Sequence, residues 1–246
     1  MDILPKIITK GKVIGQFKDE KQYSNWISNK LKTRTYIKIR NNLYGLVDPS
    51  TNDIYGTKFE IASNISETSF ICFHSALEYY GIANQVFNDV IVGSLTKFNG
   101  FTFNDNEFIY KPAKSLTLIN DVASEGIRVT SLEKTIVDCI DEISFSGGIE
   151  EVLNALEQIK YLNEEKLIEA LDEYGKMFLY QKVGYLLETY NDRFNLAKDF
   201  FGKCKSHLTN KVNYLEKDAF KKVSLNKDWN LLVPRNIQSR INGGFW

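Results

Sequence analysis

The sequence predicts an α+β protein with two domains, and three observations lead to this prediction. The basic N-terminal stretch combines the spacing of an amphipathic helix with that of a short hairpin. Residues 86–129 hold short runs of β-branched and aromatic residues separated by Asn, Gly and Asp, a pattern typical of strands. From Gly147 onward, apolar residues recur at helical spacing. We therefore expect a small domain over residues 1–48 and a larger α/β domain over residues 49–246, with a mixed or antiparallel sheet and a helical, basic C-terminal portion.

The formal net charge of +0 conceals an uneven distribution along the 246 residues. Residues 1–50 contain ten Lys and Arg against four Asp and Glu, and residues 191–246 contain eleven against five. Basic ends of this kind often belong to an anion-binding module, although solvated surface charge produces similar totals. Residues 131–190 contain five basic residues against thirteen acidic ones. We expect these acids on solvated helix faces, with a surface for a basic partner or a mimic of the DNA backbone as the alternatives.

Composition and motifs exclude several classes of protein. No run of about 18 apolar residues occurs, and the N-terminal residues lack the apolar stretch of a secretory signal. The scattered cysteines Cys72, Cys139 and Cys204 form no CxxC pair, and with only two histidines they do not match a zinc site. Glycine motifs that bind phosphates are also missing from the sequence. We therefore expect a cytoplasmic protein without a cofactor, a metal or a membrane segment.

Two helices are expected before the hairpin. Pro5 suits the first turn of a helix whose apolar stripe would include Ile7 and Ile8. A second helix is expected over residues 21–32, because four apolar residues recur there at helical spacing. These inward-facing residues are Tyr23, Trp26, Ile27 and Leu31. The opposite face carries no carboxylate and consists of Lys21, Asn25, Ser28, Asn29 and Lys32.

The stretch TYIKIRNNLYGLV, residues 35–47, predicts two short strands joined by a turn at Asn41-Asn42. A two-residue loop places Arg40 opposite Leu43. The same register places Ile39 opposite Tyr44. Because side chains alternate along a strand, we expect one apolar face and one face that carries cations. The apolar face would hold Ile37, Ile39, Tyr44 and Leu46, and the other face would hold Lys38 and Arg40.

A helix with a polar face followed by a basic hairpin is the pattern of a winged helix-turn-helix DNA-binding domain. A groove helix needs amides, hydroxyls and cations that reach base edges, and a wing needs cations for the DNA backbone. The candidates for the groove helix are Lys21, Asn25, Ser28, Asn29 and Lys32. The candidates for phosphate or minor-groove contact are Arg34, Lys38 and Arg40. The alternative is a small α+β subdomain with a solvated polar face.

The rest of the chain predicts one sheet and a series of helices. We expect a short helix over residues 58–65 and a strand that leads into a helix ending at Gly81. A sheet of about four to six strands should follow, and then a helix capped by Thr130 or Ser131. His74 is expected to be structural. Four amphipathic helices should come after Gly147, separated by breaks at Asn163, Gly175 and Asn191.

An enzymatic alternative is a metal-dependent nuclease, because such sites combine carboxylates with a lysine near strands. The strand-rich region contains the residues that this alternative would need: Asp89, Asp105, Glu107 and Lys111. Their spacing does not match an acid that directly precedes a lysine on one strand face. We therefore expect a protein that is not an enzyme.

Three stretches resemble the AbiEi-type antitoxins of type IV toxin–antitoxin systems, which act in abortive infection. They are IKIRNNLYGLV in the hairpin, FEIASNISETSFICFHSALEYYGI at residues 59–82, and IRVTSLEKTIVDCID at residues 127–141. Residues 184–188 also resemble a later segment of the family, so that the resemblance covers about residues 1–190. The chain departs from the family at Asn41-Asn42, where the turn lacks the usual glycine.

The resemblance implies an N-terminal winged helix that binds operator DNA and a C-terminal domain with antitoxin activity. Such a protein represses its own toxin–antitoxin operon at inverted repeats and neutralises a nucleotidyltransferase-like toxin, with or without binding it directly, as part of antiviral defence. It would be a monomer in solution or bind DNA cooperatively. A protein-interaction antitoxin that acts mainly through its C-terminal domain is the alternative. The matched helix at residues 131–141 fits the core as well as a functional site.

Overall fold

The computed structural model describes residues 4–216, 222–235 and 237, and it contains helices together with sheets, which confirms the α+β class. The chain divides into two compact units. Unit 1 comprises Met1–Ile71, Asn88–Leu116 and Asp121–Val129. Unit 2 comprises Cys72–Phe87, Thr117–Asn120 and Thr130–Trp246, so the boundary expected near residue 48 falls inside unit 1. Among the described helices, none combines the length and the apolar character needed to cross a membrane.

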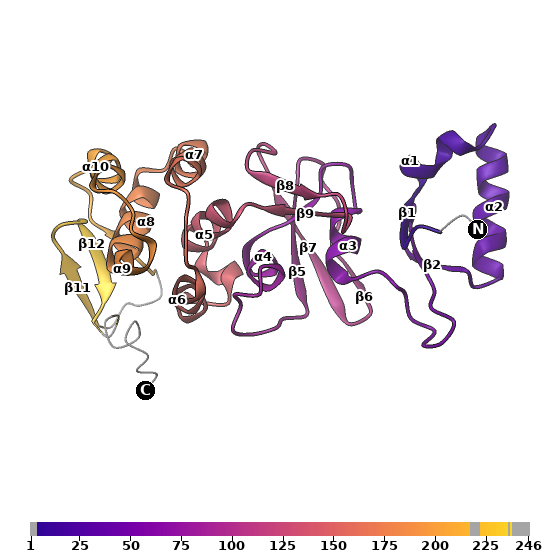
Figure 1. Cartoon of the computed structure of the whole chain (residues 1–246), viewed down its shortest axis with the longest axis horizontal. Coiled ribbons are helices and arrows are strands. Elements are labelled where there is room, and N and C mark those ends of the chain that lie inside the picture. Colours follow the sequence, from indigo (N-terminus) through magenta and orange to yellow (C-terminus); the bar gives the residue numbers. More distant parts are fainter. Residues whose placement is uncertain (1–3, 217–221, 236, 238–246) are drawn as a thin grey trace. The chain divides into compact units, whose positions relative to one another are not determined.

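Unit 1 begins with a three-stranded antiparallel sheet in the order β1-β3-β2 (Figure 1). Its strands and the helices between them are β1 (Ile7–Thr9), α1 (Lys10–Val13), the 3-10 helix η1 (Ile14–Gln16), α2 (Glu20–Lys32), β2 (Tyr36–Arg40) and β3 (Leu43–Leu46). The expected helix at Pro5 is wrong, because Ile7 and Ile8 belong to strand β1. Ile8 pairs with Tyr44, so β3 supplies the hydrogen-bond partners of β1. The local spacing of apolar residues does not reveal this pairing.

The larger sheet has six strands in the order β6-β7-β5-β4-β9-β8. The elements are α3 (Lys58–Ser63), β4 (Phe70–Ile71), β5 (Asp89–Ser94), β6 (Phe101–Phe103), β7 (Asn106–Pro112), β8 (Ile119–Val122) and β9 (Ile127–Thr130). Strands β5 and β7 are parallel, whereas β4 and β5 are antiparallel, so of the two alternatives, a mixed or an antiparallel sheet, the structure shows the mixed one. The Arg128 guanidinium donates to the carbonyls of Ser63 and Ser66 at 2.6 and 2.8 Å. It thereby provides hydrogen-bond donors for backbone carbonyls at and after the end of α3.

The described part of unit 2 is mainly helical. Its helices are α4 (Phe73–Tyr79), α5 (Leu132–Asp141), the 3-10 helix η2 (Ile143–Ser146), α6 (Ile149–Gln158), α7 (Glu164–Tyr174), α8 (Met177–Thr189), α9 (Asn191–Phe194) and α10 (Lys198–Ser206). Helices α6, α7 and α8 confirm three of the four amphipathic helices expected after Gly147, whereas the fourth is divided at Asn195, with a left-handed φ of 53°, into α9 and α10. Asn163 caps α7, and Gly175 ends it with a left-handed φ of 60°, where glycine carries no steric penalty.

A small sheet near the C-terminus was not expected from the sequence. It consists of β10 (Asn213–Tyr214), β11 (Val223–Asn226) and β12 (Leu231–Pro234) in the order β10-β12-β11. Trp229 is fully buried, and its indole Nε1 donates to Glu188 at 2.5 Å. A Cβ atom on Gly184 would overlap the Trp229 ring, so this glycine lets the tryptophan pack directly against the backbone of α8.

Candidate nucleic-acid interface

Both ends of helix α2 are capped by hydrogen bonds. Asp19 precedes the helix, and its carboxylate accepts from the backbone N–H of Gln22 at 2.8 Å. At the other end the backbone N–H of Thr33 donates to the carbonyl of Asn29 at 2.9 Å. Glu20 lies in the first turn, and its carboxylate pairs with Lys10 at 2.6 Å. The carboxylates at the start of α2 are thus engaged in its capping and in an ion pair.

The inner face of α2 packs as the sequence predicts. Tyr23 and Ile27 are buried, and Trp26 and Leu31 pack against the same cluster as partly buried residues. The Trp26 ring lies 5.2 Å from Phe17 and 6.4 Å from Tyr36, measured between ring centroids. Burial raises the pKa of the Tyr23 hydroxyl to about 12. This aromatic packing holds α2 in a fixed orientation on the small sheet.

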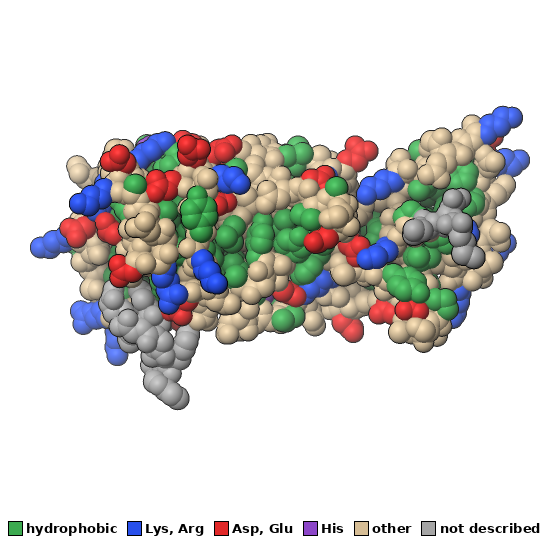
Figure 2. All heavy atoms as spheres, viewed as in Figure 1, with side chains coloured by type: hydrophobic (Ala, Val, Ile, Leu, Met, Phe, Trp, Pro, Cys, Tyr) green, Lys and Arg blue, Asp and Glu red, His purple; other side chains and the backbone are tan. Residues whose placement is uncertain are grey.

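The outer face of α2 is solvent-exposed over its whole length. The five groove candidates Lys21, Asn25, Ser28, Asn29 and Lys32 are all exposed. From Lys21 to Lys32 this stripe is about 16 Å long at the usual helical rise. Lysine and arginine side chains project from this end of unit 1 in the space-filling view (Figure 2). Helix α2 therefore presents a cationic and amide-bearing surface without a carboxylate on its outer stripe.

Strands β2 and β3 form the expected hairpin, but with a bulge. Arg40 lies opposite Leu43 as predicted, and Asn42 adopts a left-handed φ of 61° in the turn. The predicted pairing of Ile39 with Tyr44 is wrong, because Lys38 lies opposite Tyr44 and the register shifts between Lys38 and Arg40. An extra residue of this kind bends a strand and redirects the side chains that follow.

The bulge lies between Lys38 and Arg40, two of the three cations proposed for phosphate contact. Arg34 and Lys38 are exposed, and Arg34 has a left-handed φ of 53°. Arg40, which alternation placed on the cationic face with Lys38, is half-buried and packs on two aromatic rings. Its guanidinium carbon lies 4.9 Å from the ring centroid of Phe101 and 5.5 Å from that of Phe98. Burial lowers the pKa of Arg40, and its Nη1 has no hydrogen-bond partner among the described residues.

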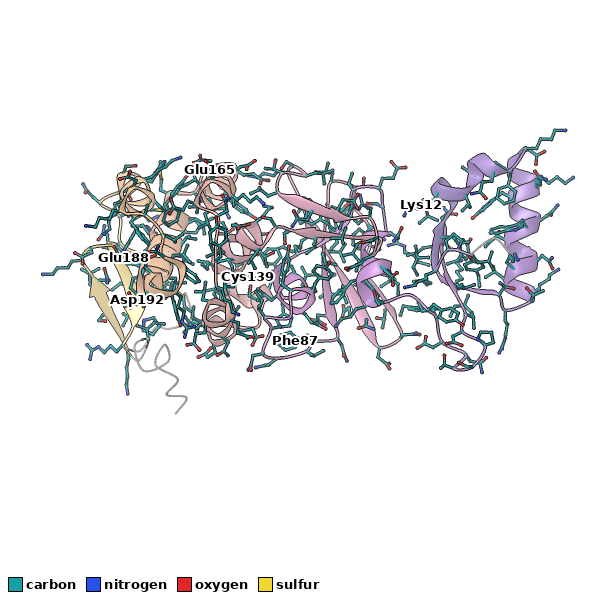
Figure 3. The ribbon with its side chains drawn as sticks, viewed as in Figure 1. Lys12, Phe87, Cys139, Glu165, Glu188 and Asp192 are labelled. Carbon is teal, nitrogen blue, oxygen red and sulfur yellow. The ribbon has the colours of Figure 1, made fainter. Side chains whose placement is uncertain are left out.

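Sequence reasoning missed two lysines, Lys10 and Lys12, that lie near the hairpin turn. Lys12 comes from α1 and is labelled in Figure 3; its ammonium donates to the Asn64 side chain at 2.6 Å. Burial, followed by the nearby Arg128, lowers the pKa of Lys12. Lys10 and Lys12 line a hollow of about 840 Å³ in unit 1, which also includes Asn42 and Arg128. The total positive charge of residues 1–50 is the sequence signal that could have included these lysines.

The charged residues of α5 lie in the core of unit 2. Ser131 caps the helix by accepting from the N–H of Lys134 at 3.2 Å. The Lys134 ammonium lies 3.4 Å from Asp138 and 3.3 Å from Glu173, and all three side chains are mostly buried. The Tyr174 hydroxyl donates to Asp138 at 2.6 Å. Burial raises the pKa of Asp138 to about 6, although Lys134 and Tyr174 oppose this shift.

The remaining candidates for chemistry do not converge on one site. His74 is buried 3.3 Å from Glu151, whose carboxylate also accepts from the backbone N–H of Asn84 at 2.6 Å. The free cysteines Cys72, Cys139 and Cys204 are buried. Asp89 and Glu107 lie side by side on β5 and β7, and Lys111 lies opposite Gly93 on the same strand pair. Within the described ranges, no group of three or more His, Cys, Asp or Glu residues is arranged to hold a metal ion.

Comparison with known proteins identifies a similar fold. No family model matches this sequence, and no curated protein matches it. The crystal structure of the RV2827C protein from Mycobacterium tuberculosis is similar with a TM-score of 0.62. The similarity covers 93% of this chain and 86% of that chain at 10% sequence identity. At this identity the comparison shows a shared fold and carries no statement about activity.

Proposed function

We propose that this chain is a DNA-binding antitoxin whose N-terminal residues form a winged helix and bind double-stranded operator DNA at inverted repeats. The observation that carries the DNA-binding part is the outer stripe of α2, where five exposed residues supply cations, amides and a hydroxyl without a carboxylate. These groups match what base edges and phosphates accept. Exposed Lys38 and Arg34 extend the positive charge beyond the helix.

Within this proposal the residues divide by role. Lys21 and Lys32 stand at the two ends of the stripe and would contact phosphates on either side of a groove. Asn25, Ser28 and Asn29 lie between them and would face base edges. Lys38 and Arg34 would contact the neighbouring backbone. Arg40 supports the hairpin through Phe98 and Phe101 and is left out of the contact set.

The test measures DNA affinity against salt concentration, with a labelled duplex from the region upstream of the chain's own gene. Replacing Lys21 and Lys32 by alanine should reduce the slope of log affinity against log salt by about two. The reason is that DNA binding releases about one counterion for each phosphate contact, and the variant makes two fewer contacts. The matched control replaces Lys160 and Lys166, two exposed lysines of unit 2, and should leave the slope unchanged. An equal slope in the two folded double variants would refute binding through α2.

The antitoxin part of the proposal rests on the resemblance to AbiEi-type antitoxins and predicts a nucleotidyltransferase-like toxin encoded beside this chain. The second candidate is a protein-interaction antitoxin in which unit 2 acts alone, and the acidic block at residues 131–190 favours it. The full-length chain with Lys21, Lys32 and Lys38 replaced by alanine separates the two. Rescue of toxin-expressing cells by this variant would place neutralisation outside DNA binding, whereas loss of rescue would tie it to repression.

A further inference from the structure

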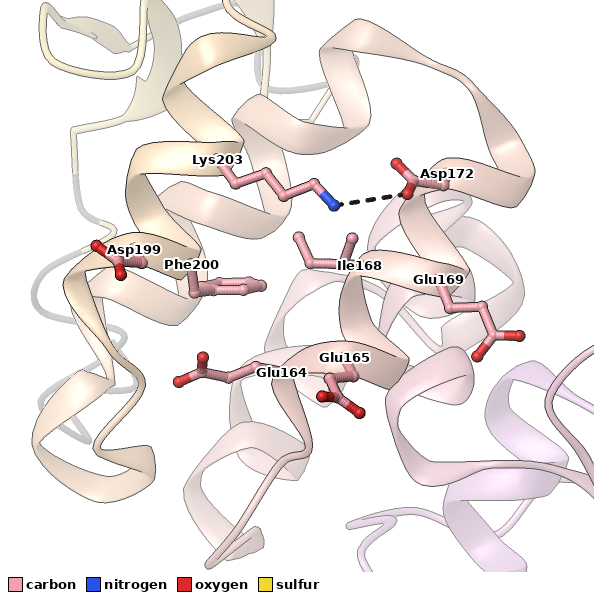
Figure 4. Close-up of a pocket in the computed structure, with 8 residues that line it drawn as sticks. All are labelled: Glu164, Glu165, Ile168, Glu169, Asp172, Asp199, Phe200 and Lys203. Carbon is pink, nitrogen blue, oxygen red and sulfur yellow. Dashed lines mark ion pairs between the residues drawn. The ribbon is translucent and has the colours of Figure 1, made fainter.

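Helices α7 and α10 of unit 2 line an open hollow of about 550 Å³ that none of the preceding assignments uses (Figure 4). Its apolar part comes from Ile168 of α7 and Phe200 of α10, which face each other across the opening in Figure 4. Phe200 is buried, and Ile168 is half-buried. Ile168 therefore keeps apolar surface that a ligand could cover.

Carboxylates surround this apolar floor, and two of them are already engaged. Glu164 accepts from the backbone N–H of Ala197 at 2.6 Å and thereby connects α7 to the start of α10. Asp172 pairs with Lys203 at 3.7 Å, as the dashed line in Figure 4 marks. Lys203 is the cation among the residues that line the hollow. Its exposed ion pair with Asp172 contributes little to stability and can rearrange when a ligand binds.

Three further carboxylates of the rim are uncompensated. Glu165, Glu169 and Asp199 are exposed, and they form no side-chain hydrogen bond or ion pair with the described part of the chain. Glu165 and Asp199 lie in the first turns of α7 and α10, where a negative charge stabilises the helix. Glu169 lies near the middle of α7, so helix stabilisation does not account for it.

We propose that this groove between α7 and α10 binds a cationic segment of a partner protein. A large apolar side chain of the segment rests on Ile168 and Phe200, and flanking lysines or arginines pair with Glu165, Glu169 and Asp199. Charge complementarity selects a basic polypeptide, because a nucleic acid would be repelled by the same carboxylates. The apolar floor adds the requirement that the segment carries a large apolar side chain, which charge complementarity alone does not impose. The proposal concerns unit 2 and does not rest on DNA binding by α2.

The test uses the full-length protein and two fluorescein-labelled peptides, Lys-Arg-Lys-Leu-Lys-Arg-Lys and the same peptide with serine in place of leucine. Fluorescence anisotropy should show that the leucine peptide binds several-fold more tightly than the serine peptide. Replacing Glu165 and Glu169 by glutamine and Asp199 by asparagine should weaken binding of the leucine peptide by about tenfold. Ile168→Ala should remove most of the preference for leucine over serine.

A matched control neutralises three exposed carboxylates that do not line the groove, with Asp89→Asn, Glu107→Gln and Asp192→Asn. This variant changes the net charge equally and should keep the affinity of the wild type. Glu169→Gln alone provides a second measurement if the triple groove variant does not fold. No binding of the leucine peptide, or equal weakening in both triple variants, would overturn the proposal. A wild-type dimer that the groove variant converts to a monomer would also overturn it, because a second copy of the chain would then be the occupant.

Discussion

Helices α2 and α5 both carry several charged residues, but they expose these charges very differently. On α2, Lys21 and Lys32 are exposed on a face opposite to the packed aromatic residues. On α5, Lys134 and Asp138 are buried and paired with each other. Exposed cations remain available to a ligand, whereas a buried pair is part of the core and must stay paired.

The α5 residues that carry part of the sequence resemblance are the buried ones. The α5 stretch Glu-Lys-Thr-Ile-Val-Asp carries a fairly specific part of the resemblance, and its charged members lie in the core of unit 2. Glu133 accepts from the backbone N–H of Asn163 at 3.0 Å, which places the start of α7 against α5. The α2 pattern is far less specific as a sequence, yet it presents the accessible surface. The charged residues of this stretch thus pack in the core of unit 2, whereas the outer lysines of α2 face solvent.

The largest effect is expected from breaking the buried pair. Lys134→Ala leaves the Asp138 and Glu173 carboxylates without their ammonium partner, and it should lower the free energy of unfolding by about 3–5 kcal/mol. Urea denaturation measures this loss. Lys21→Ala is the matched exposed substitution and should change stability by less than about 0.5 kcal/mol. Similar effects of the two substitutions would remove the distinction between α5 and α2.

The pH dependence of stability sharpens the same comparison. The pKa of Asp138 is raised to about 6 in the folded protein, so the native state holds a proton that the unfolded state has already released. The free energy of unfolding should therefore fall as the pH rises from about 4 to about 7, by up to about 3 kcal/mol. This contribution is fully present below the unfolded pKa of Asp138 and is lost above its folded pKa.

Asp138→Asn should remove that part of the pH profile, since asparagine does not titrate. Urea midpoints measured between these pH values for the wild type and the variant provide the difference. Asp192 is an exposed carboxylate of α9, and the Asp192→Asn variant should retain the pH dependence of stability of the wild type. Superimposable profiles for Asp138→Asn and the wild type would show that Asp138 titrates normally.

A smaller effect distinguishes two cations of the same hairpin strand. Arg40 behaves like the charges of α5, because it packs on Phe98 and Phe101, whereas exposed Lys38 resembles the lysines of α2. Arg40→Ala should cost about 1 kcal/mol of stability and leave the salt slope of DNA binding unchanged. Lys38→Ala should preserve stability and reduce that slope by about one. A reduced slope in Arg40→Ala would mean that the guanidinium leaves the rings to bind phosphate.

Local patterns were sufficient for the regular helices and for part of the hairpin. The spacing of Tyr23 and Ile27 identifies the buried face of α2, and its exposed stripe follows from the same periodicity. Asn163 and Gly175 mark the two ends of α7 because capping and left-handed conformations depend on the residue itself. A sheet of about four to six strands could also be predicted, since β-branched and aromatic runs between turn residues are a local signal, but its mixed strand directions could not.

Long-range contacts decided the rest. Strand β1 exists because β3 pairs with it, and no property of Ile7 or Ile8 alone distinguishes a strand from a helix. The bulge before Arg40 shifts the register of the hairpin, and Phe98 and Phe101 then cover the guanidinium from a distant part of the sequence. The sequence by itself determined which residues are charged and how they repeat. Only the tertiary structure decided which charges are paired in the core and which face solvent, because burial depends on partners that are far away along the chain.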